Sequence, residues 1–353
     1  MTKEQPSLKT EKKEEEMEDL DFIKEVIDKE KEKIWDVRHK IHENPELGFQ
    51  EFETAKLVKE ELKKLGIEII GEGIGKTGII ARVKGLEGCK TVCLRADMDA
   101  LPIKEETGLP YASKKEGISH ACGHDVNTAS LLGGAKALKV LAEQGKLKGD
   151  VLLIFQPNEE RSDKKRQSGA VQMIKFMEEK GLRKNLDAIF GLHVWGDAER
   201  GNVLLPREIF CAGSSSFKLK MEAPGGHVSE TYKLPNIEKL LAKVEVALDE
   251  KFGHELPQEE KPKVILEPGL HKTDSQAINI LAKEGEVSWT LRILLPGAEF
   301  KKKRAEIIQE LKNTLLDVVG PWQEKGAKWE VDYNPGTRPI TMRDPKLVEL
   351  GRE

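Results

Sequence analysis

Apolar positions recur along the chain with two different periods. Short, mainly apolar runs, typical of buried strands, occupy 78–83, 91–97, 150–156 and 187–194. Apolar positions three and four residues apart predict helices from Met17 to Val37 and over 52–65, 127–144 and 168–180. Strands that alternate with helices favour an α/β fold, in which a mostly parallel sheet is covered by helices on both faces.

From about Gly213 the pattern changes. Strands are predicted over 215–221, 263–266, 286–295 and 327–332, and helices over 236–252 and 299–319. This is a βαββαβ order, which indicates a small α+β domain with its helices on one face of an antiparallel sheet.

Composition narrows the class of protein. The 353 residues include 58 Lys and Arg against 62 Asp and Glu, a net charge of -4, which argues against a nucleic-acid partner bound by a basic face. The chain has no apolar run long enough to span a membrane and no secretory signal at its start. Its four cysteines are too few for a disulfide scaffold. We therefore expect a soluble, cytoplasmic protein without a membrane partner.

Two short motifs carry metal-binding side chains. Cys122 and His124, in the run HACGHD, can bind one cation such as zinc, although both also suit an ordinary loop. Glu159 and Glu160 follow the predicted strand 150–156. Adjacent carboxylates are common in solvated loops, but at the end of a strand one can bind a metal while the other acts as a general base.

Three further polar residues stand out by their positions. Asp97 and His193 end apolar runs, and function in α/β sheets gathers at the carboxyl ends of strands. His193 would equally suit a buried core position. His227 follows two glycines in a turn of the second domain.

The order of these motifs resembles a known family. The segments are RHKIHENPELGFQEFETAKLV, LRADMDALPI, HACGHD, FQPNEE and FGLHVW. They are similar to the amidohydrolase branch of the dinuclear-metal peptidases, which includes thermostable carboxypeptidases, aminoacylases, hippurate hydrolases and auxin–amino-acid conjugate hydrolases. The similarity extends from about Glu32 to Arg343 and is densest between Arg38 and Trp195.

Composition, pattern and resemblance together predict a division of the chain into four segments. Residues 1–16 are a charged, flexible tail, and 17–213 form the metal-binding catalytic domain. Residues 214–334 form an inserted lid and dimerisation domain, and 335–353 begin the return to the catalytic domain. We expect the rest of that return to be absent from this chain.

The resemblance also implies roles for individual residues. It implies four metal ligands, which are Cys122, His124, Glu160 and His193. Glu159 matches the general base, and Asp97 matches an acid that orients the metal site. In the lid, His227 matches an oxyanion-stabilising residue and Asn279 a substrate-contacting residue.

The implied activity is hydrolysis of N-acyl amino acids or of C-terminal peptide bonds by a homodimer or larger homo-oligomer formed through the lid. Two divalent ions are expected. Zinc is the preferred candidate, and cobalt, nickel or manganese are also compatible with these ligands.

Some positions depart from the family pattern. Asn127 stands where the family usually carries a second His after CGHD, and the stretch 161–166 is charged where the family is glycine-rich. No His follows His271, so one metal site is expected to lack a ligand. Besides a fragment of an active hydrolase, two alternatives therefore stay open. One is a non-catalytic relative that binds one metal or an amino-acid conjugate, and the other is an interaction protein that dimerises through the lid.

Overall fold

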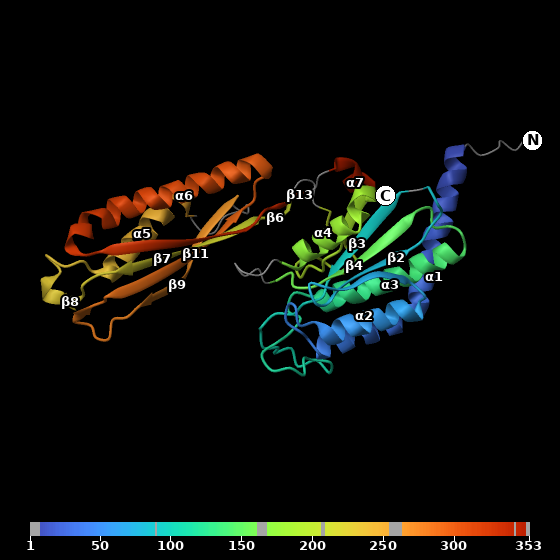
Figure 1. Ribbon diagram of the computed structural model, residues 1–353, viewed down its shortest axis with the longest axis horizontal. Helices are drawn as coiled ribbons and strands as arrows, with labels where there is room; N and C mark the ends of the chain where they lie inside the picture. Colours follow the sequence, from blue (N-terminus) through green and yellow to red (C-terminus); the bar gives the residue numbers. More distant parts are fainter. Residues whose placement is uncertain are drawn as a thin grey trace, which may run out of the picture. The chain divides into compact units, whose positions relative to one another are not determined.

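The chain divides into two compact units, an amino-terminal unit that ends at Asp197 and a carboxy-terminal unit that begins at Ala198 (Figure 1). The computed structural model describes residues 8–88, 90–160, 168–205, 209–253, 263–341 and 344–350.

A five-stranded sheet in the order β1-β2-β4-β3-β5 forms the centre of the amino-terminal unit. Its strands are β1 (Glu68–Ile74), β2 (Gly78–Val83), β3 (Thr91–Asp97), β4 (Asp150–Gln156) and β5 (Ala188–Gly191). Strand β3 runs parallel to both β4 and β5, whereas the β1–β2 and β2–β4 pairs are antiparallel.

The predicted α/β architecture is confirmed, but the sheet is mixed instead of mostly parallel. A short turn joins β1 to β2, and strands joined in this way pair antiparallel. Strand β1 was not predicted, because it contains Gly71 and Gly73 and buries only two of its seven residues. Its apolar pattern is therefore weak.

Helices cover both faces of this sheet. Helices α1 (Leu8–Glu43), α2 (Phe52–Lys64) and α3 (His124–Glu143) share one core with the sheet, which includes Val37, Leu62 and Phe155. Helix α4 (Gly169–Glu179) packs on the opposite face, where Met173 and Met177 contact a second core. The short 3-10 helix η1 (Leu182–Asn185) follows α4.

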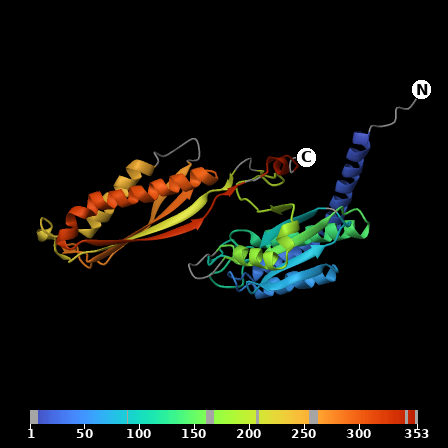
Figure 2. The ribbon, with the colours of Figure 1, turned by 45° about the horizontal axis from the view of Figure 1, so that its top comes forward.

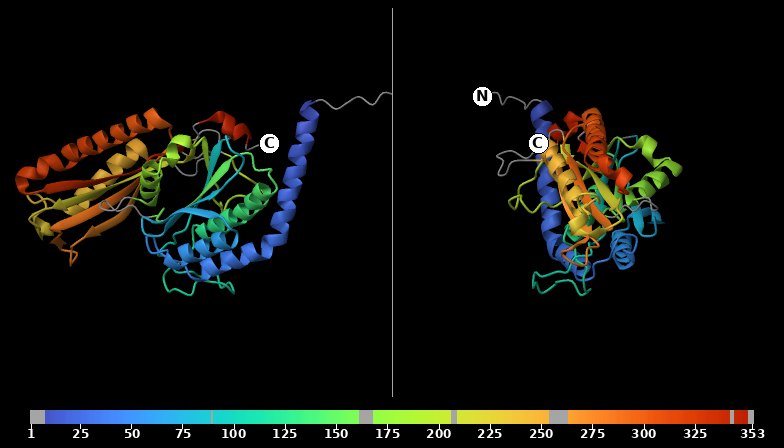
Figure 3. Two further views of the ribbon diagram at one scale, coloured as in Figure 1. Left: turned by 45° about the vertical axis from the view of Figure 1, so that its right-hand side comes forward. Right: turned by 90° about the vertical axis from the view of Figure 1, so that its left-hand side faces the viewer.

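Helix α1 is longer at its start than the sequence pattern predicted (Figure 3). It begins at Leu8, so residues 8–16 are helical although we expected a flexible tail there. Lys and Glu are good helix formers, and a helix that is already formed extends at little cost. Residues 1–7 of the expected tail and the charged stretch 161–166 lie outside the described residues.

The carboxy-terminal unit contains a four-stranded antiparallel sheet in the order β12-β7-β11-β9. The strands are β7 (Gly213–Glu222), β9 (Val264–Thr273), β11 (Glu284–Ile293) and β12 (Lys328–Thr337). Helices α5 (Ile237–Phe252) and α6 (Gly297–Val319) lie along one face (Figure 2). Buried residues such as Leu219, Leu241 and Trp289 form the core between these helices and the sheet. The element order is βαββαβ.

Several short elements complete this unit. Strand β6 (Ile209–Cys211) pairs with β13 (Ile340–Thr341), and β8 (Gly226–His227) pairs with β10 (Ile280–Leu281). The remaining helical segments are η2 (Val228–Glu230), η3 (Gly320–Lys325) and α7 (Pro345–Leu350). None of the helices in the described part of the chain has the length and apolar character needed to cross a membrane.

Candidate metal centre

The predicted metal-binding residues of the amino-terminal unit gather at one edge of its sheet. Asp97 is the last residue of β3, Glu159 and Glu160 follow β4, and His193 follows β5. These three strands are parallel neighbours, so their carboxyl ends meet at the same edge.

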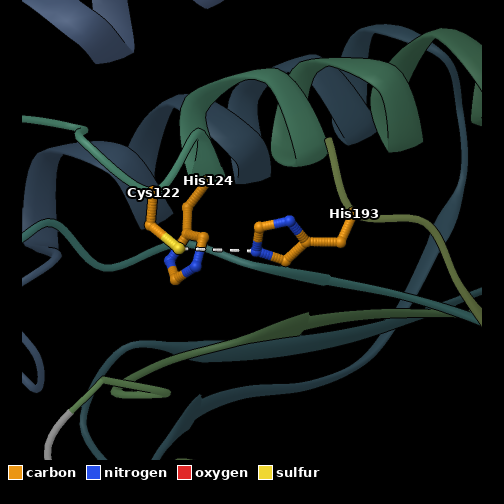
Figure 4. Close-up of side chains that lie close together, drawn as sticks. All are labelled: Cys122, His124 and His193. Carbon is orange, nitrogen blue, oxygen red and sulfur yellow. Dashed lines mark hydrogen bonds between the residues drawn. The ribbon is translucent and has the colours of Figure 1, made fainter. Parts of the chain in front are cut away.

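Two groups of ligand atoms share one imidazole. The first group is Cys122, His124 and His193, and the second is His124, Glu159 and Glu160; within each group the ligand atoms lie within 4.8 Å of one another. Figure 4 shows the first group, in which Cys122 Sγ lies 3.5 Å from His193 Nε2. Glu160 Oε1 lies 3.8 Å from His124 Nε2. His124 therefore lies between a thiol and a pair of carboxylates.

A sharp turn at Gly123 brings Cys122 and His124 together. Gly123 precedes the first residue of α3 and has a φ of 79°, in the left-handed region that glycine adopts easily. A Cβ atom at this position would lie 2.3 Å from Cγ2 of Val194. Gly123 thus permits both the turn and the close approach of the segment that carries His193.

Both histidines present Nε2 to the cluster. His124 Nδ1 lies 2.8 Å from the main-chain oxygen of Asp99, and His193 Nδ1 lies 2.7 Å from that of Val194. A carbonyl can only accept, so in each neutral ring the proton is on Nδ1 and Nε2 carries the lone pair. Metal-binding histidines are commonly oriented in this way.

The donor set fits a divalent metal ion. His124 Nε2 is buried and has no hydrogen-bond partner among the described residues. An unpaired buried nitrogen costs free energy unless something binds it. Thiolate, imidazole and carboxylate donors together suit zinc and similar ions.

The charges around His124 favour a cation at this position. Burial opposes its protonated form, but Asp99, Cys122 and Asp97 outweigh burial and raise the pKa of His124 to about 11. The His124 and His193 imidazoles beside it lower the pKa of the Cys122 thiol and so favour the thiolate. Desolvation and the neighbouring Glu160 carboxylate raise the pKa of Glu159, although part of its side chain is exposed.

Asp97 lies beside the cluster and is held by two hydrogen bonds. It is 1% exposed, and Oδ2 accepts from Arg95 Nη1 at 2.6 Å while lying 3.7 Å from His124 Nε2. Oδ1 accepts from Asn127 Nδ2 at 2.8 Å, and Asn127 Oδ1 accepts from the main-chain N–H of Val194 at 3.2 Å. The Asn127 amide therefore connects the ends of β3 and β5.

Sequence reasoning recorded Asn127 only as a departure from the family pattern. The signal that could have identified it is its spacing, because it follows His124 by three residues on the same face of α3. A second group of side chains lies on the other side of this turn. Arg38 Nε and His42 Nδ1 each lie 2.7 Å from Asp125 Oδ2, next to His124 in the chain.

The two predicted lid residues lie in the carboxy-terminal unit and are close to each other. Strand β8 carries His227, which pairs with Ile280 of β10. Asn279 Nδ2 lies 3.5 Å from His227 Nε2, and its main-chain oxygen accepts from Val228 N at 3.0 Å. His227 Nδ1 accepts from Ser229 N at 3.3 Å.

An α/β sheet with nitrogen, sulfur and oxygen donors at the carboxyl ends of its strands is the framework of a metal-dependent hydrolase. The comparison with protein families agrees, since residues 93–353 match peptidase family M20/M25/M40. The chain belongs to this family. It is an enzyme of the amidohydrolase and peptidase class, and its general chemistry is metal-dependent hydrolysis of amide bonds. The resemblance inferred from the sequence motifs is thereby confirmed.

Similar proteins include both peptidases and amidohydrolases. Thermostable carboxypeptidase 2 of Saccharolobus solfataricus is 33% identical over 319 residues, which cover 90% of this chain and 75% of that protein. Hippurate hydrolase of Campylobacter jejuni is 43% identical over 216 residues, which cover 61% of this chain and 52% of the hydrolase. A crystal structure described as a dinuclear metal binding peptidase of the M20 family, from Bacillus subtilis, has a TM-score of 0.70 and 28% identity. That match covers 90% of this chain and 77% of the other.

Proposed function

We propose that this enzyme cleaves the amide bond of N-acyl amino acids or the C-terminal peptide bond of short peptides. The observation that carries the proposal is the pair of donor groups that share His124, with the two adjacent carboxylates in one of them. The names of three similar proteins point to such substrates: a carboxypeptidase, a hippurate hydrolase and an N-acetyl-L-cysteine deacetylase.

The proposed metal ligands are Cys122, His124, His193 and Glu160. Two divalent ions are expected, and zinc is the preferred candidate. When bound, such ions polarise the substrate carbonyl and make water more acidic. The ligand atoms of each group lie within 4.8 Å of one another, which is close enough for one ion to bind them together.

Glu159 is the proposed general base. Its neighbour Glu160 lies near His124 Nε2, whereas the Glu159 side chain is exposed at the edge of the site, where water can reach it. A carboxylate there can take a proton from the attacking water and return it to the departing amine.

The carboxy-terminal unit would serve as lid and dimerisation domain. Its proposed contributions to the active site are His227 and Asn279. The Ser229 N–H group donates to His227 Nδ1, a contact compatible with a neutral ring that carries its proton on Nε2. A neutral imidazole with a proton at Nε2 can donate to the oxyanion that forms on the substrate. Asn279, beside that nitrogen, would contact the substrate.

Two isosteric variants test the assignment of the carboxylates. We expect Glu159→Gln to lower kcat by about 10²-fold or more while the metal content stays the same, because an amide cannot accept the proton. Glu160→Gln should instead lower the metal content. Suitable substrates are N-acetyl, N-benzoyl and indole-acetyl amino acids and dipeptides, each assayed with added zinc, cobalt or manganese.

Two results would contradict the proposal. Loss of metal from Glu159→Gln would show that Glu159 is a ligand, and unchanged turnover would remove it as the base. Metal binding without turnover of any substrate in the panel would favour the non-catalytic alternative.

A further inference from the structure

The loop before α2 contains two buried glutamates, Glu46 and Glu51, which are 8% and 0% exposed. Such carboxylates are very costly to bury unless hydrogen bonds compensate them. The loop belongs to the RHKIHENPELGFQEFETAKLV segment, which resembles the family but provides none of the proposed metal ligands. Its two glutamates have different partners.

Glu46 caps helix α2 from outside the helix. Its carboxylate accepts from the N–H groups of Glu53 and Thr54 at 3.2 and 2.9 Å, and from Thr54 Oγ1 at 3.0 Å. These N–H groups belong to the first turn of α2, where the side chain of the N-cap residue usually accepts. The N-cap residue is Glu51, whose side chain makes no such bond. Glu46 therefore leaves the Glu51 carboxylate available for other partners.

The Glu51 side chain reaches the turn that carries the two proposed site carboxylates. Its Oε1 accepts from the N–H of Asn158 at 2.8 Å, and its Oε2 accepts from Thr77 Oγ1 at 2.7 Å. The next two N–H groups of that turn, those of Glu159 and Glu160, donate to Asp99 at 2.9 and 3.0 Å. Three successive N–H groups are thus bound by two buried carboxylates.

The backbone of this turn adopts a conformation that needs support. Asn158 has a φ of 44°, in the left-handed region that asparagine adopts more readily than most residues but less readily than glycine. It also packs closely against Gly48, because a Cβ atom there would lie 1.9 Å from Asn158 Oδ1. Its main-chain oxygen accepts from Gly169 N at 3.2 Å.

We propose that Glu51 is a positioning residue, which holds the 158–160 turn so that Glu160 is directed at the metal site while Glu159 is left to act on water. Glu51 does this through the Asn158 N–H group and contacts neither the metal nor the substrate. The inference rests on the proposed roles of Glu159 and Glu160.

The matched variants are Glu51→Leu, Glu51→Gln and Glu46→Leu. Glu51→Leu should accelerate hydrogen exchange of the amides of residues 158–160, lower kcat by about 10²-fold with little change in KM, and weaken zinc binding, because small displacements of catalytic groups are costly. Glu51→Gln keeps an acceptor oxygen and should retain most of the activity. Glu46→Leu should lower the unfolding temperature but leave kcat and zinc affinity within about twofold of the unmodified enzyme.

A milder variant covers the case in which Glu51→Leu does not fold. Gly48→Ala alters no charge but pushes against Asn158, and it should weaken zinc binding in the same direction. Equal losses of kcat and zinc affinity in Glu51→Leu and Glu46→Leu would overturn the inference, because they would show a general effect on folding. Unchanged exchange of the 158–160 amides in Glu51→Leu would also overturn it.

Glu159→Gln, measured in parallel, separates this inference from the proposed function. If that variant turns over normally, the proposed base is wrong. Zinc affinity and amide exchange in Glu51→Leu then test the positioning role without reference to activity, and a loss of both supports it.

Discussion

The buried side-chain amide of Asn127 connects two segments of the candidate metal centre. Its donor binds Asp97 and its acceptor binds Val194 N–H, so it needs both halves of the amide group. The side chain is 3% exposed, so neither partner can easily turn to water if the amide is removed. Asn127 thereby links the acid beside His124 with the residue that follows His193.

We expect Asn127→Leu, which is similar in size but apolar, to lower the free energy of unfolding by about 1–3 kcal/mol, because it leaves two buried polar groups unpaired. Metal affinity should also fall, by about 10-fold, because Asp97 beside His124 and the segment that carries His193 lose their common support. Chemical denaturation and zinc titration measure the two effects. Asn44→Leu, at an exposed asparagine just after α1, is the control and should change neither quantity much. Unchanged zinc affinity in Asn127→Leu would contradict the role of Asn127 in supporting the metal site.

At the scale of elements, the start of α3 places the thiol and the imidazole. The helix begins at His124, directly after Gly123, and the segment that follows β5 passes within contact distance of that glycine. The conformation of one residue therefore sets the separation of donors that come from two different elements.

Gly123→Ala should destabilise the enzyme by about 1–2 kcal/mol from the left-handed backbone alone, with a further loss from the contact with Val194. Adding Val194→Ala should recover part of that further loss, which a double-mutant cycle of unfolding free energies would measure. Gly134→Ala is the control in the same helix: nothing lies within 4 Å of a Cβ there, so it should stabilise by about 0.5–1 kcal/mol. Equal effects of the two glycine substitutions would contradict this account.

At the scale of the whole molecule, each unit has a hydrophobic core of its own. In the amino-terminal unit the cores lie on the two faces of the mixed sheet, and in the carboxy-terminal unit the core lies under α5 and α6. The candidate metal ligands Cys122, His124, Glu160 and His193 all belong to the amino-terminal unit.

Calorimetry of the whole chain should therefore resolve two unfolding transitions, and zinc should raise the temperature of only one. A ligand at 100 times its Kd stabilises the state that binds it by about 2.7 kcal/mol. Cys122→Ser should reduce this shift and leave the other transition in place. The assignment of the metal to one unit would be contradicted if zinc shifted both transitions equally and Cys122→Ser reduced both shifts equally.

The main elements and the principal chemical groups can be predicted from the amino-acid pattern. Strands β2, β3 and β4 begin and end where the apolar runs predict, because strands inside a sheet that is covered on both faces are mainly apolar. Cys122 and His124 were identifiable because two ligands of one ion can come from neighbouring positions in a turn. Strand β1 escaped prediction because glycines and exposed residues weaken its pattern.

The hydrogen bonds that support the site become visible only in the folded structure. The hydrogen bond between Glu51 and Asn158 joins residues 107 positions apart in the sequence. The hydrogen bond between Asn127 and Val194 joins residues 67 positions apart. Hydrophobic periodicity indicates which positions are buried, but it does not indicate which buried polar groups form hydrogen bonds with each other. Those pairings arise only when strands and helices pack, and they place the two candidate ligand groups around His124.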